Sequence, residues 1–342
     1  MRTRSGSPRV DIHFTGEQVS IAEVVRLSKL AEEAGFGAVW HAEGFRDSLI
    51  PLATVAAHTT RIRIGSDVTQ WTRTLPNMEL TAGDLQEVSN GRFTLGLGAT
   101  VKAWNENWHG INYDRPLRRM REYIEGLRTL WTADVTSPVS YEGEIFQVRD
   151  YLRFNGPLKN PPKIHIGLSL PGMAKLAGEI ADGINFNAVN SPVYLAETLL
   201  PAVAEGAAKA GRTLADLELG VLTITAVHDD VEEARRLARH QLAFYCGATT
   251  YFEPLMIRHG LQDGYAAIRE AFFRGDLLEA VARVPQEMID VVTLCGTPAD
   301  VRQQLHRYDG LVDFVMLYSP SFILPQADVL ANHERMIAAF AD

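Results

Sequence analysis

Cysteine is scarce in this sequence, and the two residues that occur suggest neither a metal site nor a disulfide framework. Cys246 and Cys295 lie far apart and lack the close pairing that zinc ligands show. Small secreted proteins instead carry several cysteines that form disulfides. We therefore expect two reduced, partly buried thiols in a cytoplasmic protein.

Long apolar runs and an excess of positive charge are also missing. No segment approaches the roughly 20 apolar residues of a membrane span, and the first residues contain no apolar signal core. The formal net charge is −9, from 33 basic and 42 acidic residues. Because a nucleic-acid site needs clustered basic and aromatic side chains, we expect no membrane insertion, no secretion and no nucleic-acid binding.

Several catalytic motifs are absent or incomplete. No Gly-x-Ser-x-Gly elbow is present, and His13 stands alone where a metal-dependent barrel hydrolase has a His-x-His pair, so we expect no metal. Gly96-x-Gly98 begins like a dinucleotide fingerprint, but Val101 occupies the third glycine position and no apolar helix follows. The two glycines either let a flat ring approach the strand or allow close packing. The sequence leaves both roles open.

The sequence does contain a regular alternation of strands and helices. Short apolar stretches, each followed by residues of helical periodicity, recur along the whole chain. The expected strands cover 10–14, 38–40, 61–64, 93–98, 163–167, 183–186, 217–227 and 312–317, and Thr297 with Pro298 predicts a helix start. This pattern predicts one domain over residues 1–342, a (β/α)8 TIM barrel, with a doubly wound sheet as the alternative. Insertions are expected at about 99–115, 132–162 and 246–292.

In such barrels the functional residues lie in the loops after the carboxyl ends of the strands. One of these loops, residues 169–172, is a short turn that leads directly into an expected helix. Free N–H groups at a helix start, together with the helix dipole, bind anions. The turn is therefore a candidate phosphate site, and an ordinary capped helix is the alternative.

Segments along the chain resemble the luciferase-like flavoprotein family. The clearest is NGRFTLGLG at residues 90–98. Others, in the family's order, cover 34–40, 60–65, 116–123, 141–146, 176–183 and 296–298. Residues 102–106 (KAWNE) are similar to the branch of the family that uses coenzyme F-420, a deazaflavin. The resemblance extends over nearly the whole chain.

The resemblance implies where a flavin-type ring would lie. It places the ring against a bulge after the third strand, with a cis peptide either between Ser66 and Asp67 or between Asp67 and Val68. Asp67 departs from the family pattern, in which small or apolar residues are usual at this place. The resemblance implies further coenzyme contacts at Thr69, Gly98, Thr100, Asn105, Leu168, Ser169, Leu170 and Gly172.

The resemblance also implies acid–base residues near the ring. Glu43 matches an acidic residue after the second strand, and Glu17 matches an acid at the end of the first. Relatives often have a catalytic histidine where this chain has Gly44, so His41 becomes the candidate replacement. His109 is a further candidate acid–base group. Glu17 and Glu43 are equally well explained as loop caps or as ion-pair partners of Arg46 or Arg73.

We therefore expect a coenzyme F-420-dependent oxidoreductase that transfers a hydride between the deazaflavin and a small organic substrate. A reduced-FMN monooxygenase and a non-catalytic flavin-binding relative are the alternatives. Aromatic residues near two insertions suggest a hydrophobic or aromatic substrate: Trp71, Trp104, Trp108, Tyr113, Phe244, Tyr245, Tyr251 and Phe252. Relatives commonly form homodimers, and the apolar helices of the first half of this chain are expected to serve that role.

Overall fold

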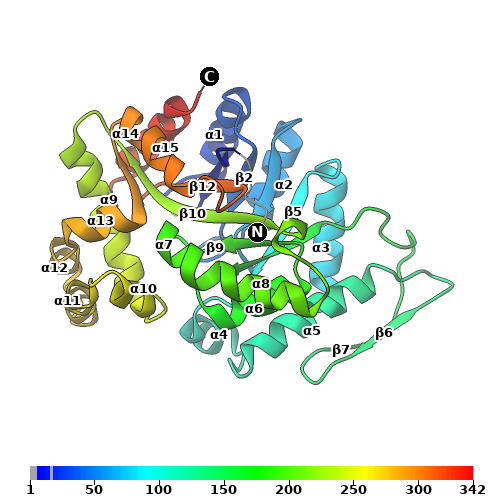
Figure 1. The fold of residues 1–342 in the computed structure, drawn as a ribbon. Coiled ribbons are helices and arrows are strands. Elements are labelled where there is room, and N and C mark those ends of the chain that lie inside the picture. The colour runs from blue at the N-terminus through cyan, green and yellow to red at the C-terminus, as the bar shows by residue number, and fades with distance from the viewer. Residues whose placement is uncertain (1–5, 16–17, 342) are drawn as a thin grey trace.

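The structure is a computed structural model that describes residues 6–15 and 18–341. Its centre is a barrel of eight parallel strands (Figure 1): β1 (Arg9–Phe14), β2 (Ala38–His41), β3 (Arg63–Ser66), β5 (Phe93–Gly98), β8 (Lys163–Leu168), β9 (Gly183–Phe186), β10 (Glu218–Val227) and β12 (Phe314–Tyr318). β12 pairs with β1 as well as with β10, so the sheet closes on itself. The predicted (β/α)8 barrel is confirmed. The doubly wound sheet is wrong, because such a sheet keeps two open edges.

The main helices lie outside the barrel: α1 (Ile21–Glu33), α2 (Leu49–His58), α3 (Leu75–Val88), α5 (Pro116–Leu130), α6 (Pro171–Ile180), α8 (Leu200–Lys209), α9 (Val231–Ala248), α14 (Pro298–Leu305) and α15 (Gln326–Ala339). The first of them shows why these segments are helical. Ser20 caps α1 by accepting a hydrogen bond from the backbone N–H of Glu23. Val24, Leu27 and Ala31 follow helical spacing and are buried.

The three predicted insertions contain distinct structures. α4 (Lys102–His109) follows β5, and β6 (Val139–Glu142) pairs antiparallel with β7 (Gln147–Tyr151) in a hairpin that projects from the body (Figure 1). The third insertion is helical, as expected: α10 (Glu253–Arg258), α11 (Gln262–Phe273), α12 (Leu277–Ala282) and α13 (Gln286–Val292).

One predicted helix start is confirmed, and one predicted strand is displaced. Thr297 caps α14 by accepting from the N–H of Asp300, with Pro298 as the first helical residue. The third strand was expected at 61–64 but begins at Arg63. The cause is Glu32, whose Oε1 accepts hydrogen bonds from the backbone N–H groups of Arg61 (2.6 Å) and Ile62 (2.9 Å). These two backbone N–H groups are therefore not available for strand pairing, and the strand begins one residue later, at Arg63.

Two short strands were not predicted. β4 (Thr69–Gln70) pairs with the end of β5, and β11 (Thr293–Gly296) pairs with the end of β10. β4 matters for the site, because it continues the third strand after an interruption.

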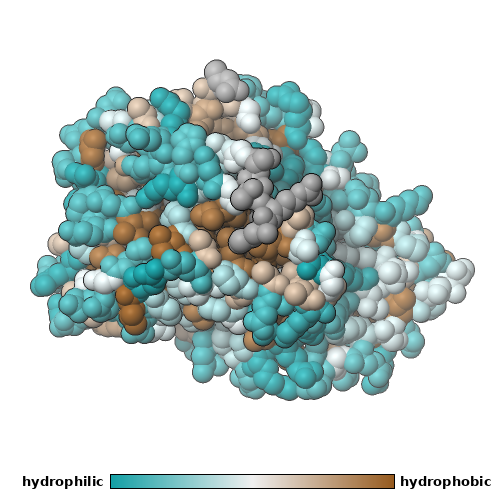
Figure 2. All heavy atoms as spheres, viewed as in Figure 1, coloured by the Kyte–Doolittle hydropathy of each residue, from teal (hydrophilic) through white to brown (hydrophobic). Residues whose placement is uncertain are grey.

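The outer surface differs in character from the barrel interior. Hydrophilic side chains cover most of the face in Figure 2, and hydrophobic patches lie near the middle of the view. No helix within residues 6–15 and 18–341 is both long and apolar enough to cross a membrane.

Candidate active site

The third strand is interrupted by a bulge at the carboxyl end of the barrel. Gly65 pairs with Thr94, and pairing resumes only where Thr69 meets Leu97, so the β3 side carries one extra residue. The side chain of Ser66 fills the gap in the ladder. Its Oγ accepts from the N–H of Gly96 and donates to the carbonyl of Gly96, each at 2.9 Å.

The bulge contains a non-proline cis peptide between Asp67 and Val68, the second of the two positions expected. Neighbouring glycines make room for it. A Cβ at Gly98 would lie 2.1 Å from Val68 Cγ2, and a Cβ at Gly167 would lie 2.3 Å from Val68 Cγ1. Of the two roles left open by the sequence, the structure gives Gly98 the role of close packing, against the bulge itself.

Asp67 points into the barrel, where no arginine or lysine among the described residues pairs with it. Asn185 Nδ2 donates to Asp67 Oδ1 at 3.0 Å, and His13 Nε2 lies 3.4 Å from Oδ2. His13 Nε2 also lies 3.1 Å from the backbone oxygen of Asp67. Burial raises the pKa of Asp67 to about 7, although the hydrogen bond from Asn185 acts to lower it.

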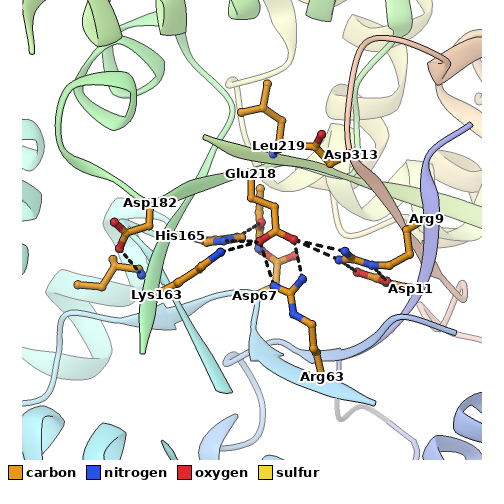
Figure 3. A network of polar contacts seen from close by, with 12 residues as sticks. Arg9, Asp11, Arg63, Asp67, Lys163, His165, Asp182, Glu218, Leu219 and Asp313 are labelled. Atoms are coloured by element: carbon orange, nitrogen blue, oxygen red, sulfur yellow. Dashed lines mark hydrogen bonds and ion pairs between the residues drawn. The ribbon is translucent and has the colours of Figure 1, made fainter. Parts of the chain in front are cut away.

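A column of polar side chains continues from Asp67 along the barrel interior (Figure 3). We call Asp67, Asn185, His165, Glu218 and Arg63 the polar column. Asn185 Oδ1 lies 3.0 Å from His165 Nδ1, His165 Nε2 lies 3.7 Å from Glu218, and Arg63 donates to both Glu218 oxygens at 2.7 and 3.0 Å. Burial acts to raise the pKa of Glu218, but the hydrogen bond and charge of Arg63 prevail and hold it at about 2.

The sequence interpretation missed this column. Its members come from strands that lie far apart in the chain, and the neighbouring His13 was considered only as a possible metal ligand. A signal was present, since Asp11 and His13, and Lys163 and His165, occupy alternate positions of strands that are otherwise apolar. Residues at alternate positions share one face of a strand.

Two of the candidate acid–base residues, Glu43 and His41, already contact other groups of the protein. Glu43 forms an ion pair with Arg73 (Oε1 to Nη1, 2.6 Å) and accepts from the N–H of Gln70 at 2.9 Å. Burial raises the pKa of Glu43, against the opposing charge of Arg73. His41 is fully buried, its Nδ1 lies 2.8 Å from the carbonyl of Ala42, and burial lowers its pKa to about 4. Glu17 lies outside the described residues.

The polar side chains that follow β3 and β5 already form hydrogen bonds within the protein. Thr69 Oγ1 lies 2.7 Å from Ser48 Oγ, and Thr100 donates to Gln70 at 3.2 Å. Asn105 accepts from Trp71 Nε1 at 2.8 Å and donates to the carbonyl of Ala99 at 2.9 Å. Asn105 therefore holds Trp71 in place beside the mouth of the barrel.

The predicted phosphate segment lies at the start of α6. The strand β8 ends at Leu168, Ser169 follows it, and Leu170 is the N-cap of α6. Leu170 offers no side-chain oxygen, so no side chain caps the helix. Gly172, in the first turn, is exposed. The first N–H groups of this helix therefore remain available for an anion.

Aromatic side chains gather around the mouth from two insertions. Trp104 and Trp108 stack with ring centroids 4.7 Å apart, and Phe45 lies 5.5 Å from Trp104. A Cβ at Gly44 would lie 3.5 Å from the Trp104 indole, so Trp104 packs directly against the backbone of Gly44.

Near the end of α9, just before the third insertion, Tyr245 contacts Tyr318 (ring centroids 6.1 Å apart), which contacts His13 (5.4 Å). Within the described part of the chain, no group of three or more His, Cys, Asp or Glu side chains is arranged to hold a metal ion.

Comparison with known proteins places the chain in a family. The family model described as luciferase-like monooxygenase matches residues 7–313. A 5,10-methylenetetrahydromethanopterin reductase of Archaeoglobus fulgidus is 34% identical over 292 residues, which cover 81% of this chain and 83% of the relative.

Solved structures show the same fold. The coenzyme F-420-dependent tetrahydromethanopterin reductase from Methanopyrus kandleri superposes with a TM-score of 0.83 at 23% identity, covering 98% of this chain and all of that chain. The oxygenating constituent of 3,6-diketocamphane monooxygenase from Pseudomonas putida, in complex with FMN, gives 0.70 at 18% identity, covering 98% of both chains. The prediction of an oxidoreductase is confirmed. The chain belongs to the luciferase-like monooxygenase family.

Proposed function

We propose that the protein is a coenzyme F-420-dependent oxidoreductase that transfers a hydride between the deazaflavin and a small organic substrate. The observation that carries the proposal is the 34% identity, over four fifths of the chain, to a methylenetetrahydromethanopterin reductase. The neighbouring reductase structure is itself named for its dependence on F-420.

The residues at the barrel mouth fit such a coenzyme in two respects. The N-terminus of α6 has no side-chain cap, which suits a phosphate group of the coenzyme tail. His41 Nε2 is buried and has no hydrogen-bond partner among the described residues, which suits a polar group of a bound ring. The ring would lie against the bulge formed by Ser66, Asp67, Val68 and Thr69 and beside Gly98, Thr100 and Asn105. Leu168, Ser169, Leu170 and Gly172 would face the phosphate.

When bound, a deazaflavin supplies a ring carbon that accepts or donates a hydride. The chain's own part is to position the ring, to exclude water with the aromatic residues around the mouth, and to hold protons. Of the three candidates Glu17, Glu43 and His41, we keep Glu17 and His41 as the proposed acid–base groups. Because Glu43 is paired with Arg73, its proposed role is to orient the β4 segment that begins at Thr69.

The substrate proposed for this site is organic and hydrophobic or aromatic. Trp104, Trp108 and Phe45 form a stacked apolar surface beside the mouth. Such rings bind flat apolar groups through area and edge contacts.

A reduced-FMN monooxygenase is the second candidate, because a neighbour of the same fold was solved with FMN. Addition of F-420 or FMN to the purified protein, followed by absorbance and fluorescence quenching, separates the two. We expect tight, saturable binding of F-420. Tight binding of FMN with none of F-420 would overturn the proposal, and coenzyme binding without turnover on a broad substrate panel would favour a non-catalytic relative.

We also propose that two copies associate through α2 and α3. A groove between these helices is lined by five apolar residues (Leu49, Ile50, Ala53, Leu85 and Val88) and by five polar or charged ones (Asp47, Arg73, Asn77, Thr81 and Asp84). Ile50 is 61% exposed and Val88 is 52% exposed. Large apolar side chains that share one exposed groove are typical of an interface.

A further inference from the structure

Asp67 is a carboxyl group that is buried without a cationic partner among residues 6–15 and 18–341. Its side chain is 6% exposed, and its polar contacts are one amide donor, Asn185, and the ring of His13. An ionised carboxylate in such a place lacks the charge partner that normally offsets its lost hydration. The neutral, protonated form is therefore unusually favourable here.

The side chains that contact Asp67 from the surrounding strands, His13 and Asn185, are neutral near pH 7. The charged members of the polar column, Glu218 and Arg63, lie behind His165 and pair with each other. His13 on β1 has its pKa lowered to about 3 by burial, and His41 on β2 has its pKa lowered to about 4. From β9 the neighbour is the uncharged Asn185, and behind it His165 on β8 also has its pKa lowered by burial to about 4. β5 and β8 face the bulge with Gly98 and Gly167. Burial without a cation partner therefore singles out Asp67 as the carboxyl group of this cluster that favours a bound proton.

The carboxyl group cannot turn away to water. The backbone N–H of Asp67 donates to the carbonyl of His41 at 2.9 Å, and Val68 is enclosed by Gly98 and Gly167. Ser66 anchors the other side of the bulge to Gly96. The charge of Asp67 therefore stays at the floor of the barrel mouth.

We propose that Asp67 is a redox-linked proton site, a carboxyl group that binds a proton when the coenzyme in the barrel mouth accepts a hydride. The inference rests on the proposed function. The substrate C–H bond breaks, and its hydrogen and two electrons form a new C–H bond on the coenzyme ring. The substrate is thereby oxidised and the ring is reduced. The reduced ring would carry one more negative charge, and the ionised Asp67 would take up the proton that the oxidised substrate releases to the solvent; in the reverse reaction Asp67 would return that proton.

The test is the midpoint potential of the bound coenzyme, measured against a redox dye at pH 5 and pH 9, in the wild type and in Asp67→Asn. At pH 5 both proteins carry a neutral group, and we expect equal potentials. At pH 9 the ionised Asp67 of the wild type disfavours reduction. We expect the asparagine variant to favour the reduced coenzyme about tenfold more than the wild type, which for a two-electron couple is about 30 mV.

A direct readout needs no coenzyme. The pH titration of the Asp67 carboxyl group, followed by NMR of carbon-13-labelled aspartate, should have its midpoint near neutrality. Asn185→Ala keeps Asp67 but removes the hydrogen bond that stabilises its ionised form, so its midpoint should move to higher pH. Asp229→Asn, which removes an exposed carboxylate outside the site, should leave the coenzyme potential unchanged.

The possible outcomes distinguish a failure of the Asp67 inference from a failure of the proposed F-420-dependent function. If F-420 binds but the potentials of wild type and Asp67→Asn coincide at both pH values, the inference is overturned and the function stands. A titration midpoint below about pH 5 also overturns the inference. If only FMN binds, the F-420 function fails, and the same comparison with FMN decides the role of Asp67. If neither coenzyme binds, both are overturned.

Discussion

Arg73 reaches across the barrel mouth to Glu43, and its Nη1 lies within 2.6 and 2.8 Å of the two carboxylate oxygens. Its other amino group contacts Asp47. One arginine thus neutralises two carboxylates from the loop between β2 and α2. Glu43 in turn accepts a hydrogen bond from Gln70 at the start of the segment after the bulge. The pair therefore joins the second strand's loop to the bulge.

Replacing Arg73 by Met should destabilise the protein by about 3 kcal/mol, because it leaves Glu43 buried without its partner. The loss should be larger at pH 8 than at pH 5, since the pKa of Glu43 is already raised by burial and protonation relieves the unpaired charge. Urea unfolding at both pH values measures this loss of stability. Arg149→Met breaks an exposed pair with Glu142 and should cost less than about 1 kcal/mol. Equal losses in the two variants would contradict the prediction.

Asp67→Asn should change how stability depends on pH. The pKa of Asp67 is raised from 3.8 to about 7 in the folded state. The folded protein therefore binds this proton more tightly than the unfolded chain, and stability falls as the pH rises from about 4 to about 7. The asparagine variant has no carboxyl group at this position, so this fall in stability does not occur. Its free energy of unfolding relative to the wild type should improve by up to about 3 kcal/mol between pH 5 and pH 8.

Denaturant unfolding of the two proteins at a series of pH values gives that difference directly. Asp229→Asn is the matched control and should follow the wild-type curve. Parallel curves for Asp67→Asn and the wild type would show that Asp67 does not titrate in this range.

Gly98→Ala should displace the bulge, because the new Cβ would lie 2.1 Å from Val68 Cγ2. Overpacking of this kind costs about 1–3 kcal/mol. We also expect at least tenfold weaker coenzyme binding, measured by fluorescence quenching. Val68→Ala in the same chain removes the clashing methyl groups and should recover part of both losses. Additive effects of the two changes would show that the clash is not the cause.

Gly172→Asp should weaken coenzyme binding at least tenfold, while Gly172→Ala should bind nearly as the wild type does. The nearest atom to a Cβ at this position is Leu117 Cδ1 at 3.8 Å, so both side chains fit. The aspartate adds a negative charge at the N-terminus of α6 and competes there with a phosphate. Titration with F-420 compares the two variants, and equal affinities would place the phosphate elsewhere.

Ile50→Glu should convert a dimer to a monomer in light scattering after size-exclusion chromatography, because it replaces an exposed apolar side chain of the groove between α2 and α3 by a charge. Ile257→Glu on α10 is the matched control. The two side chains are similarly exposed, at 61% and 60%, but Ile257 does not line that groove. A monomeric wild type, or a variant that stays dimeric, would count against this interface.

The barrel could be predicted from the sequence because each of its strands and helices is indicated by residues within that element or next to it. Each strand is a short apolar stretch, and each following helix has its own periodicity and often its own cap, as at Ser20 and Thr297. The bulge could be narrowed to two peptide bonds only through resemblance to a family. Its cause is not local, since the space for Val68 comes from glycines 30 and 99 residues further along the chain (Gly98 and Gly167).

The contents of the site were harder to predict. Glu43 was expected near the ring, and an ion pair with Arg73 was one of the alternatives; the structure contains that pair. Asn105 was expected to contact the coenzyme, yet its side chain already bonds Trp71 and Ala99. A sequence shows that a residue is polar, but it does not show which groups form hydrogen bonds with its donors and acceptors.

The contacts within the polar column predict which substitutions occur together among relatives of this protein. Glu218 contacts Arg9 and Arg63, and His165 lies beside it. Loss of one member removes a hydrogen-bond or ion-pair partner from a buried polar group, so single replacements should destabilise the barrel. Substitutions at these positions should therefore occur as linked sets. Relatives that keep Asp67 should also keep His13 and Asn185, and relatives with a small residue at the bulge should differ at those two positions together.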